Sequence, residues 1–266
     1  MLFRSGFFKQ FPAAVGAIVC LAISSAASAH IVSMTGFVGL WYGPTGGPSG
    51  YTNSGVSQNP YATWGDPTGT HGPFDGQSGY LLNLAPPPPT PIDQTVAPPP
   101  NTPPFLIGTF THVNEPIGGT AITGINLEVS FDILVDGVDQ GIHNFFFHFA
   151  HDETSNGLDP CPYGGANFQG VNINGCADSV TVSFIDVSDS FSVGGVAYTF
   201  NLLGFDGTDC TSGINSQFLT VEGQENPAAL CAEIRTLSSI QAPEPGTLAL
   251  LGLGLIGLTF VRRRLS

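Results

Sequence analysis

Ile125-Asn126-Leu127-Glu128-Val129-Ser130-Phe131-Asp132-Ile133 is the stretch that decides the fold, because apolar and polar residues alternate through it without a break. Successive side chains of a strand point to opposite faces, so the pattern predicts a strand with one face in a core. Asp136-Gly137 then favours a tight turn. Residues 142–151 continue as a second strand with three phenylalanines on one face: Phe145, Phe147 and Phe149.

Similar patterns extend outward from this pair of strands. Further strands are predicted at residues 106–112, 180–187, 196–205 and 218–222, whereas residues 227–234 are interpreted as a helical turn. Gly, Asn and Asp turns join these segments, and no long amphipathic helix interrupts them. The chain is therefore predicted to be all-β, with an antiparallel β-sandwich ectodomain.

The ectodomain divides by composition into three parts. Residues 30–84 are rich in Gly, Ser and aromatic residues, which predicts the N-terminal part of the β ectodomain, with short strands and long turns. Residues 85–104 are rich in proline, which has no backbone donor for a sheet, so they are interpreted as a loop or stiff linker. Residues 105–240 are expected to form the sandwich core.

The N-terminus has the three parts of a secretory signal peptide. Arg4 and Lys9 form a positive region, residues 13–23 are apolar, and Ala27-Ser28-Ala29 is a small-residue cleavage site. We therefore expect residues 1–29 to be removed by signal peptidase after passage through the secretion translocon, so that the mature chain begins at His30.

The C-terminus predicts a single transmembrane helix. The apolar run at residues 248–261 is short for a span, and Arg262, Arg263 and Arg264 follow it. Cationic residues beside a span resist translocation, so the arginines are expected on the cytoplasmic side and the ectodomain on the other. Pro243-Glu244-Pro245 disfavours helix and predicts an extended, protease-accessible segment just outside the membrane.

This order of a Pro-Glu-Pro triplet, a short apolar helix and an Arg cluster resembles the PEP-CTERM sorting signal of Gram-negative bacteria. The resemblance covers residues 243–266. It implies that an exosortase-type membrane transpeptidase cuts near Pro243, Glu244 and Pro245. The precursor would first be anchored in the inner membrane, and the ectodomain would then reach the cell surface or the extracellular space.

The ectodomain is strongly acidic. Between residues 30 and 240, Arg235 is the only Lys or Arg, against nineteen acidic residues, a formal charge of −18. Such a surface repels polyanions, which excludes electrostatic binding of nucleic acid. It is compatible with divalent cations or basic partners, or with solubility alone.

Four cysteines remain once Cys20 leaves with the signal peptide. An even number in an exported chain predicts two disulfides, and three connectivities are open. We favour Cys161–Cys176 and Cys210–Cys231, because each pair closes a local loop rich in Gly and Asn. A zinc site is the alternative, but the spacings contain no Cys-x-x-Cys motif.

Two clusters could bind metal. His143, His148 and His151 lie close in sequence, but on a strand His148 faces away from the other two, so strand-end hydrogen bonding is the alternative. No cofactor is expected; the loop that follows concentrates hard oxygen ligands suited to calcium, the best-supported ligand hypothesis, and could equally be an Asx-rich turn. Its candidate ligands are Asp152, Glu153, Asn156 and Asp159.

The segment Thr111-His112-Val113-Asn114 resembles the Thr-His-x-Asn signature of a PEP-CTERM ectodomain family and a related choice-of-anchor family. Other matching pieces are Trp64-Gly65 and residues 151–156, 174–180 and 203–205, although the Pro-rich segment departs from the pattern. No catalytic activity comes with this resemblance. Thr111, His112 and Asn114 are interpreted as polar residues that close a turn before Pro116 through local hydrogen bonds.

These features predict a non-enzymatic, exported surface or extracellular-matrix protein, linked by its resemblance to exopolysaccharide or biofilm. No nucleophile motif such as Gly-x-Ser-x-Gly or His-Glu-x-x-His occurs. The alternative is a secreted carbohydrate-binding or polysaccharide-hydrolysing protein. Trp41, Tyr42 and Trp64 could contact sugars or belong to the core. Ice binding is disfavoured, because no regular threonine array is present.

Overall fold

The computed structural model describes residues 29–95, 99–184, 188–211 and 213–237. Most of the predicted signal peptide, with Ala27, and the whole predicted sorting tail lie outside these residues, whereas Ala29 opens the first strand. Within the described part of the chain, no helix is long and apolar enough to cross a membrane.

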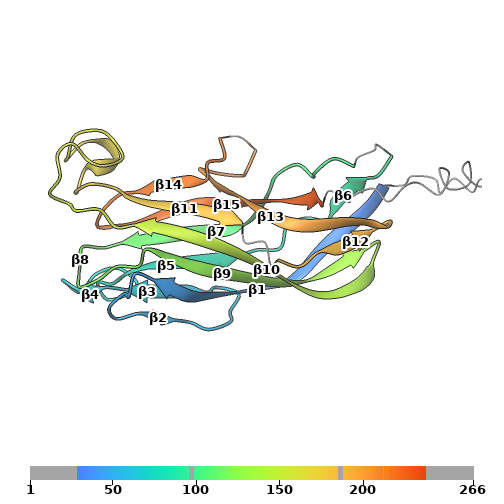
Figure 1. Ribbon diagram of the computed structural model, residues 1–266, viewed down its shortest axis with the longest axis horizontal. Helices are drawn as coiled ribbons and strands as arrows, with labels where there is room; N and C mark the ends of the chain where they lie inside the picture. Colours follow the sequence, from blue (N-terminus) through green and yellow to red (C-terminus); the bar gives the residue numbers. More distant parts are fainter. Residues whose placement is uncertain (1–28, 96–98, 185–187, 212, 238–266) are drawn as a thin grey trace, which may run out of the picture.

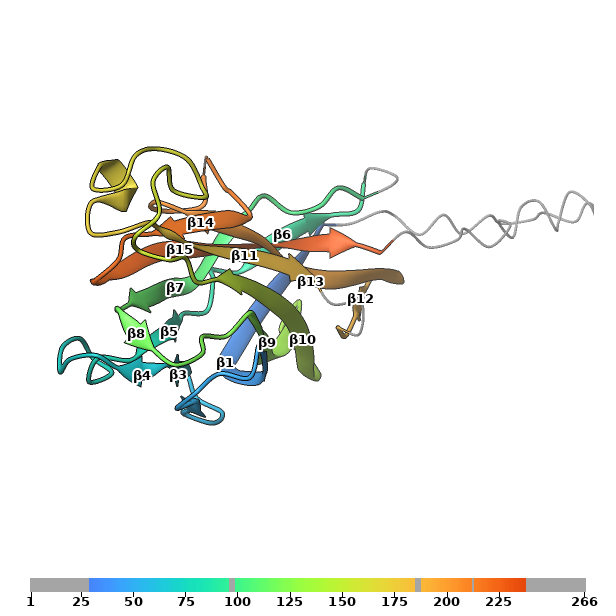
Figure 2. The ribbon, with the colours of Figure 1, turned by 60° about the vertical axis from the view of Figure 1, so that its left-hand side comes forward.

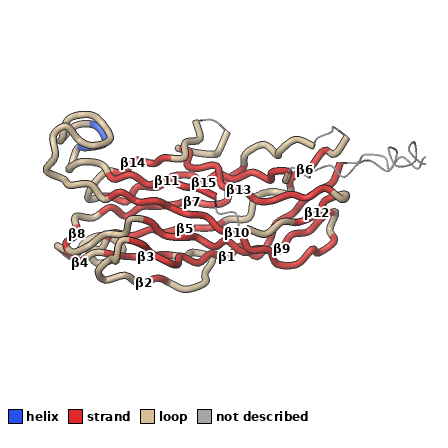
Figure 3. The backbone as a smooth tube through the Cα atoms, in the orientation of Figure 1, coloured by secondary structure: helices blue, strands red, loops and turns tan. Residues whose placement is uncertain are grey.

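Two antiparallel sheets form the molecule (Figures 1 and 3). The six-stranded sheet has the order β14-β11-β10-β9-β1-β6 and the seven-stranded sheet the order β12-β13-β15-β7-β5-β3-β2. The strands of the first are β1 (Ala29–Thr45), β6 (Thr90–Asp93), β9 (Gly124–Val135), β10 (Val138–Asp152), β11 (Asp178–Phe184) and β14 (Gln217–Thr220). Those of the second are β2 (Thr52–Asn53), β3 (Tyr61–Trp64), β5 (Ser78–Leu84), β7 (Phe105–Asn114), β12 (Phe191–Val193), β13 (Val196–Asp206) and β15 (Gln224–Thr236). A small pair, β4 (Asp66–Pro67) with β8 (Ile117–Gly118), and a 3-10 turn, η1 (Gly170–Asn172), complete the described elements. The predicted all-β sandwich is confirmed.

The predicted β9–β10 pair is the centre of the first sheet. Val135 pairs with Val138, so Asp136 and Gly137 form a two-residue loop, and both have positive φ values, 51° and 79°. This conformation matches the right-handed twist of the two strands. The alternating apolar residues of both strands are buried, and Phe131 of β9 lies 5.1 Å from Phe200 of β13 between ring centroids, across the sandwich.

One predicted element is wrong, because residues 227–234 belong to strand β15 and form no helical turn. Ala228, Leu230, Ala232 and Ile234 alternate along the strand and enter the core. The intervening small residues are covered on the other face by a disulfide cluster that includes Cys210 and Cys231. Tertiary pairing on both sides therefore overrides the helical preference of alanine.

The Pro-rich segment is not only a loop, because it contains strand β6. Thr90–Asp93 pairs with β1 at the edge of the six-stranded sheet, with Pro91 opposite Ile31. An edge strand tolerates proline because one of its sides has no ladder partner. The segment thus closes an edge of the sandwich, and the residues before and after it contribute strands to both sheets.

Both predicted disulfides are confirmed, Cys161–Cys176 and Cys210–Cys231. The first closes the long loop between β10 and β11, and the second ties the loop after β13 to β15. Trp41 and Trp64 are fully buried, so neither forms a sugar-binding surface.

Candidate functional site

Strands β7, β10 and β14 end, and β11 begins, at one end of the sandwich (Figures 1 and 2). Charged and polar side chains gather inside this end. The long loop of residues 153–177 lies at the same end. We call this group the buried polar cluster. It consists of His112 from β7, His151 from β10, Glu153 just after β10, Asp178 at the start of β11, and Glu222 in the turn between β14 and β15.

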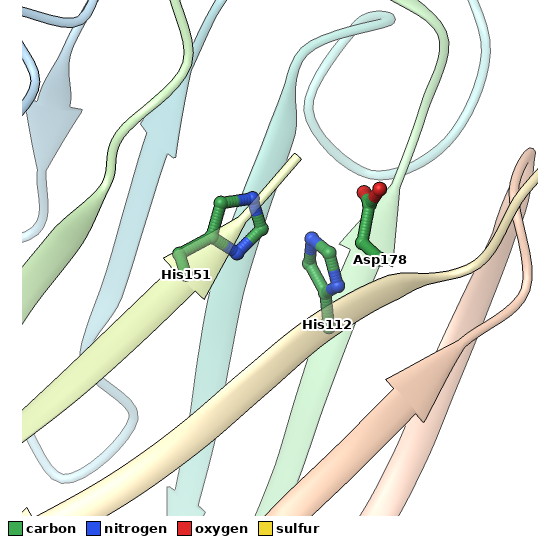
Figure 4. A group of neighbouring side chains, drawn as sticks. All are labelled: His112, His151 and Asp178. Atoms are coloured by element: carbon green, nitrogen blue, oxygen red, sulfur yellow. The ribbon is translucent and has the colours of Figure 1, made fainter. Parts of the chain in front are cut away.

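The cluster contains two overlapping sets of potential metal ligands. One nitrogen or oxygen atom from each of His112, His151 and Asp178 lies within 4.8 Å of the other two, and so does one oxygen from each of Glu153, Asp178 and Glu222. Figure 4 shows the two imidazole rings and the Asp178 carboxylate side by side. Asp178 belongs to both sets and is therefore the centre of the arrangement.

Many polar atoms at this site have no hydrogen-bond partner among the described residues. Seven of the eight such buried side-chain atoms lie in the cluster or beside it. An unpartnered buried polar group costs about 1–3 kcal/mol, so this concentration points to a bound group that would satisfy them together. These atoms are Trp64 Nε1, His112 Nε2, Asn114 Oδ1, Asn156 Oδ1, Asp178 Oδ2, and Oε1 and Oε2 of Glu222.

Hydroxyl groups fix both imidazole rings through their Nδ1 atoms. Thr220 Oγ1 lies 2.9 Å from Nδ1 of His112, and the Tyr80 hydroxyl lies 2.8 Å from Nδ1 of His151. The Nε2 atom of His151 faces Glu153 Oε2 at 3.4 Å. Hydrogen bonds of this kind orient the histidines of metal centres and leave the second ring nitrogen for the ion.

Burial dominates the electrostatics of the cluster. It raises the pKa values of Asp178 and Glu153, each further raised by the charge of a neighbouring carboxylate, and it raises the pKa of Glu222 to about 7. Burial also lowers the pKa of His151 to about 4 and that of His112 well below its usual range. The histidines are therefore neutral near pH 7, and the carboxyl groups need protons or a cation.

The protein itself supplies no cationic side chain here. Arg235 is the only Lys or Arg among residues 30–240, and it lies on β15 eleven residues beyond Gln224, the strand residue nearest Glu222 in sequence. At about 3.3 Å per residue this separation is roughly 35 Å. Within residues 30–240, the carboxyl groups can therefore be neutralised only by protons or by a bound cation.

The residues of the Thr-His-x-Asn segment take roles that differ from the predicted ones. His112 Nδ1 and Asn114 Nδ2 both contact Thr220, 108 and 106 residues away, so the interpretation as local turn-closing residues is wrong. Alternation along β7 directs these two side chains into the sandwich, while Thr111 is buried on the other face. The segment belongs to the interior of a strand and lines the buried polar cluster.

The predicted calcium ligands separate into two groups. Glu153 joins the buried polar cluster, and the Asn156 side chain lowers the pKa of Glu222 within it. Asp152 accepts a hydrogen bond of 2.5 Å from the Tyr163 hydroxyl, and Asp159 accepts one of 3.3 Å from the backbone of Asn167. Of the four predicted ligands, Glu153 therefore belongs to the cluster and Asn156 lies beside it.

The three histidines of β10 do not meet. His143 packs against Phe191, and His148 contacts the Asn126 side chain at 2.9 Å on the opposite face, as the strand alternation predicts. His151 finds its imidazole neighbour in His112 instead, with ring centroids 5.1 Å apart. The sequence singled out both histidines but did not predict that they meet, and it gave Asp178 and Glu222 no role in a site. Asp178 lies within a segment that the family resemblance had already marked.

An antiparallel sandwich with two disulfides is typical of an exported β protein. Residues 241–264 match the family model described as the PEP-CTERM protein-sorting motif, which confirms the tail predicted at residues 243–266. The chain therefore carries a PEP-CTERM sorting tail, which implies an exported precursor that an exosortase sorts. No curated protein matches the chain. The Thr-His-x-Asn and choice-of-anchor resemblance stays a prediction.

Proposed function

We propose that the protein is a non-enzymatic surface or extracellular-matrix component of a Gram-negative bacterium, linked to exopolysaccharide or biofilm. The observation that carries the proposal is the sorting motif, which begins five residues after the last described strand ends at Thr236. A disulfide-bonded sandwich is thus joined by a very short connection to a tail that sorts the exported protein.

The interior of the domain supports a structural role. Trp41, Trp64 and many of the phenylalanines are packed in the core, although Tyr61 and Phe168 are exposed. The buried polar cluster lies inside the end of the sandwich where the 153–177 loop lies. Four of its five members are nine-tenths or more buried. A polymer substrate could not reach side chains that are buried to this extent.

We expect the tail to be removed when the protein reaches the matrix. Mass spectrometry of the protein from the matrix fraction of its host should find an N-terminal peptide that begins at His30 and a C-terminus near Pro243-Glu244-Pro245. A variant with both Pro243 and Pro245 replaced by alanine should accumulate in the membrane fraction. Recovery of intact Arg262-Arg263-Arg264 on the surface protein would contradict the proposal.

A polysaccharide hydrolase is the second candidate, and one observation favours it. A groove of about 410 Å³ is lined by Glu115 and Glu225, and Glu115 Oε2 lies 2.9 Å from His71 Nδ1. Glu225 pairs with Val113, two residues before Glu115, so the two carboxylates lie on neighbouring chain segments and the same face. Two carboxylates across a groove are the minimum for glycoside hydrolysis.

The non-enzymatic proposal predicts no hydrolysis at this groove. The full chain, incubated with exopolysaccharide from its host, should release no reducing ends above a heat-inactivated control. Release that disappears in both Glu115→Gln and Glu225→Gln, with the fold intact by circular dichroism, would establish the hydrolase instead.

A further inference from the structure

We propose that the buried polar cluster is a structural binding site for one divalent first-row transition-metal ion of the zinc or manganese class. His112 and His151 would bind it through Nε2 and Asp178 through Oδ2, while Glu153 and Glu222 lie close enough to supply further oxygen ligands. The site is independent of the sorting tail and of any link to polysaccharide.

The donor set argues for this class of ion. Two neutral imidazoles with carboxylates suit zinc, manganese or iron, whereas calcium takes oxygen ligands almost alone. For each histidine the choice of ring nitrogen follows from the contacts, because Nδ1 is already held by Thr220 in one ring and by Tyr80 in the other. The remaining nitrogen, Nε2, is unpartnered in His112 and faces only Glu153 in His151.

The second line of evidence for a bound cation is the group of buried side-chain atoms that have no hydrogen-bond partner among the described residues. His112 and Asp178 have no exposed surface and Glu222 is 1% exposed, yet each carries a polar atom without a hydrogen-bond partner among the described residues. A cation would satisfy these atoms and balance the carboxylate charge in one step. The Oδ1 atom of Asp178 is occupied by the Thr154 amide at 2.7 Å, which leaves Oδ2 for the ion.

The site connects the two sheets. His112 comes from the seven-stranded sheet, and His151 and Asp178 from the six-stranded sheet. Each imidazole is also held by a hydroxyl of the opposite sheet, His112 by Thr220 of β14 and His151 by Tyr80 of β5. A bound ion would therefore link the two sheets at the end of the sandwich where the 153–177 loop lies.

The test measures metal content and thermal stability of the full chain, exported to a bacterial periplasm and purified in detergent. After EDTA treatment and dialysis, zinc should rebind at about one ion per chain. At one hundred times the Kd it should raise the Tm by about 5–10 °C. Asp178→Asn and His112→Gln should each weaken zinc binding by at least about tenfold.

Two further variants separate binding from general stability. His148→Gln changes a histidine on the opposite face of β10 and should bind zinc like the wild type. Glu222→Gln removes the charge of a buried carboxylate that has no cationic partner among residues 30–240, so it should raise the Tm of the metal-free protein while reducing the rise that zinc produces.

Several outcomes would overturn the proposal. These are a Tm shift below about 1 °C with both zinc and manganese, equal loss of metal from His148→Gln and His112→Gln, or a larger shift with calcium than with either transition metal. The last result would indicate an oxygen-only site at the acidic groups without the histidines. None of these outcomes bears on processing of the tail, which is measured separately.

Discussion

Phe131→Ala is expected to lower the free energy of unfolding by about 3–5 kcal/mol, the usual cost of truncating a buried phenylalanine. Phe131 stacks on Phe37 at 4.3 Å and on Phe145 at 5.0 Å between centroids, and it meets Phe200 of the opposite sheet at 5.1 Å. The ring is thus packed both along its own sheet and across the sandwich, so neighbouring side chains cannot collapse into the space it leaves.

Urea unfolding of the oxidised protein, followed by tryptophan fluorescence, measures this loss. Ser130→Ala is the matched control, because Ser130 is the next residue of β9 and points to the other face, where its hydroxyl donates to Asn144 Oδ1 at 2.8 Å. It should cost about 1 kcal/mol or less. Equal losses in the two variants would mean that β9 does not have the inner and outer faces described above.

The two disulfides should have similar effects on stability and different effects on metal binding. They span 15 and 21 residues, and loops of this length favour the folded state by about 3 kcal/mol through the reduced entropy of the unfolded chain. Replacing either pair by alanine should therefore lower the free energy of unfolding by about 2–4 kcal/mol.

Only the Cys161–Cys176 pair should also affect zinc affinity. Thr154 donates its hydroxyl to the Cys176 carbonyl at 2.8 Å and its amide to Asp178, so this disulfide holds the loop that positions the carboxylate. The Cys161→Ala/Cys176→Ala variant should bind zinc about tenfold or more weakly. The Cys210→Ala/Cys231→Ala variant serves as its control and should keep the wild-type affinity.

Calorimetric titration with zinc, together with urea unfolding of the metal-free proteins, distinguishes these effects. Equal loss of affinity in both disulfide variants would show that affinity follows global stability, and the assigned role of the 153–177 loop would be wrong. The stability part of this prediction does not depend on metal binding.

The fold could be predicted from sequence wherever the information is local. The alternation of residues 125–133 and the Asp136-Gly137 turn specify the central hairpin within a few positions, and both disulfides close short loops. Residues 227–234 were misassigned because small residues on both faces of β15 hide its alternation. The packing of Ala229 and Cys231 against Cys210 on the outer face, which the local pattern does not show, explains why small residues stand there.

The site could be predicted only in pieces. His112 and Glu153 were both identified, but for separate roles, because their proximity depends on how two sheets face each other. No local pattern encodes that register: His112 contacts Thr220, 108 residues away, and Tyr80 contacts His151, 71 residues away. Asp178 and Glu222 were missed because a lone acidic residue at a strand end usually lies at the surface.

The position of β15 has a mechanical consequence. The sorting tail follows this strand in sequence, and β15 lies inside its sheet with β13 on one side and β7 on the other. Antiparallel ladder bonds run perpendicular to the strands, so tension applied through the tail along β15 acts in shear, first on the β13 ladder, which extends to Thr236, and then also on the β7 ladder, which ends at Ala232. An anchored precursor can therefore bear a pulling force at its tail without unravelling from its C-terminal strand.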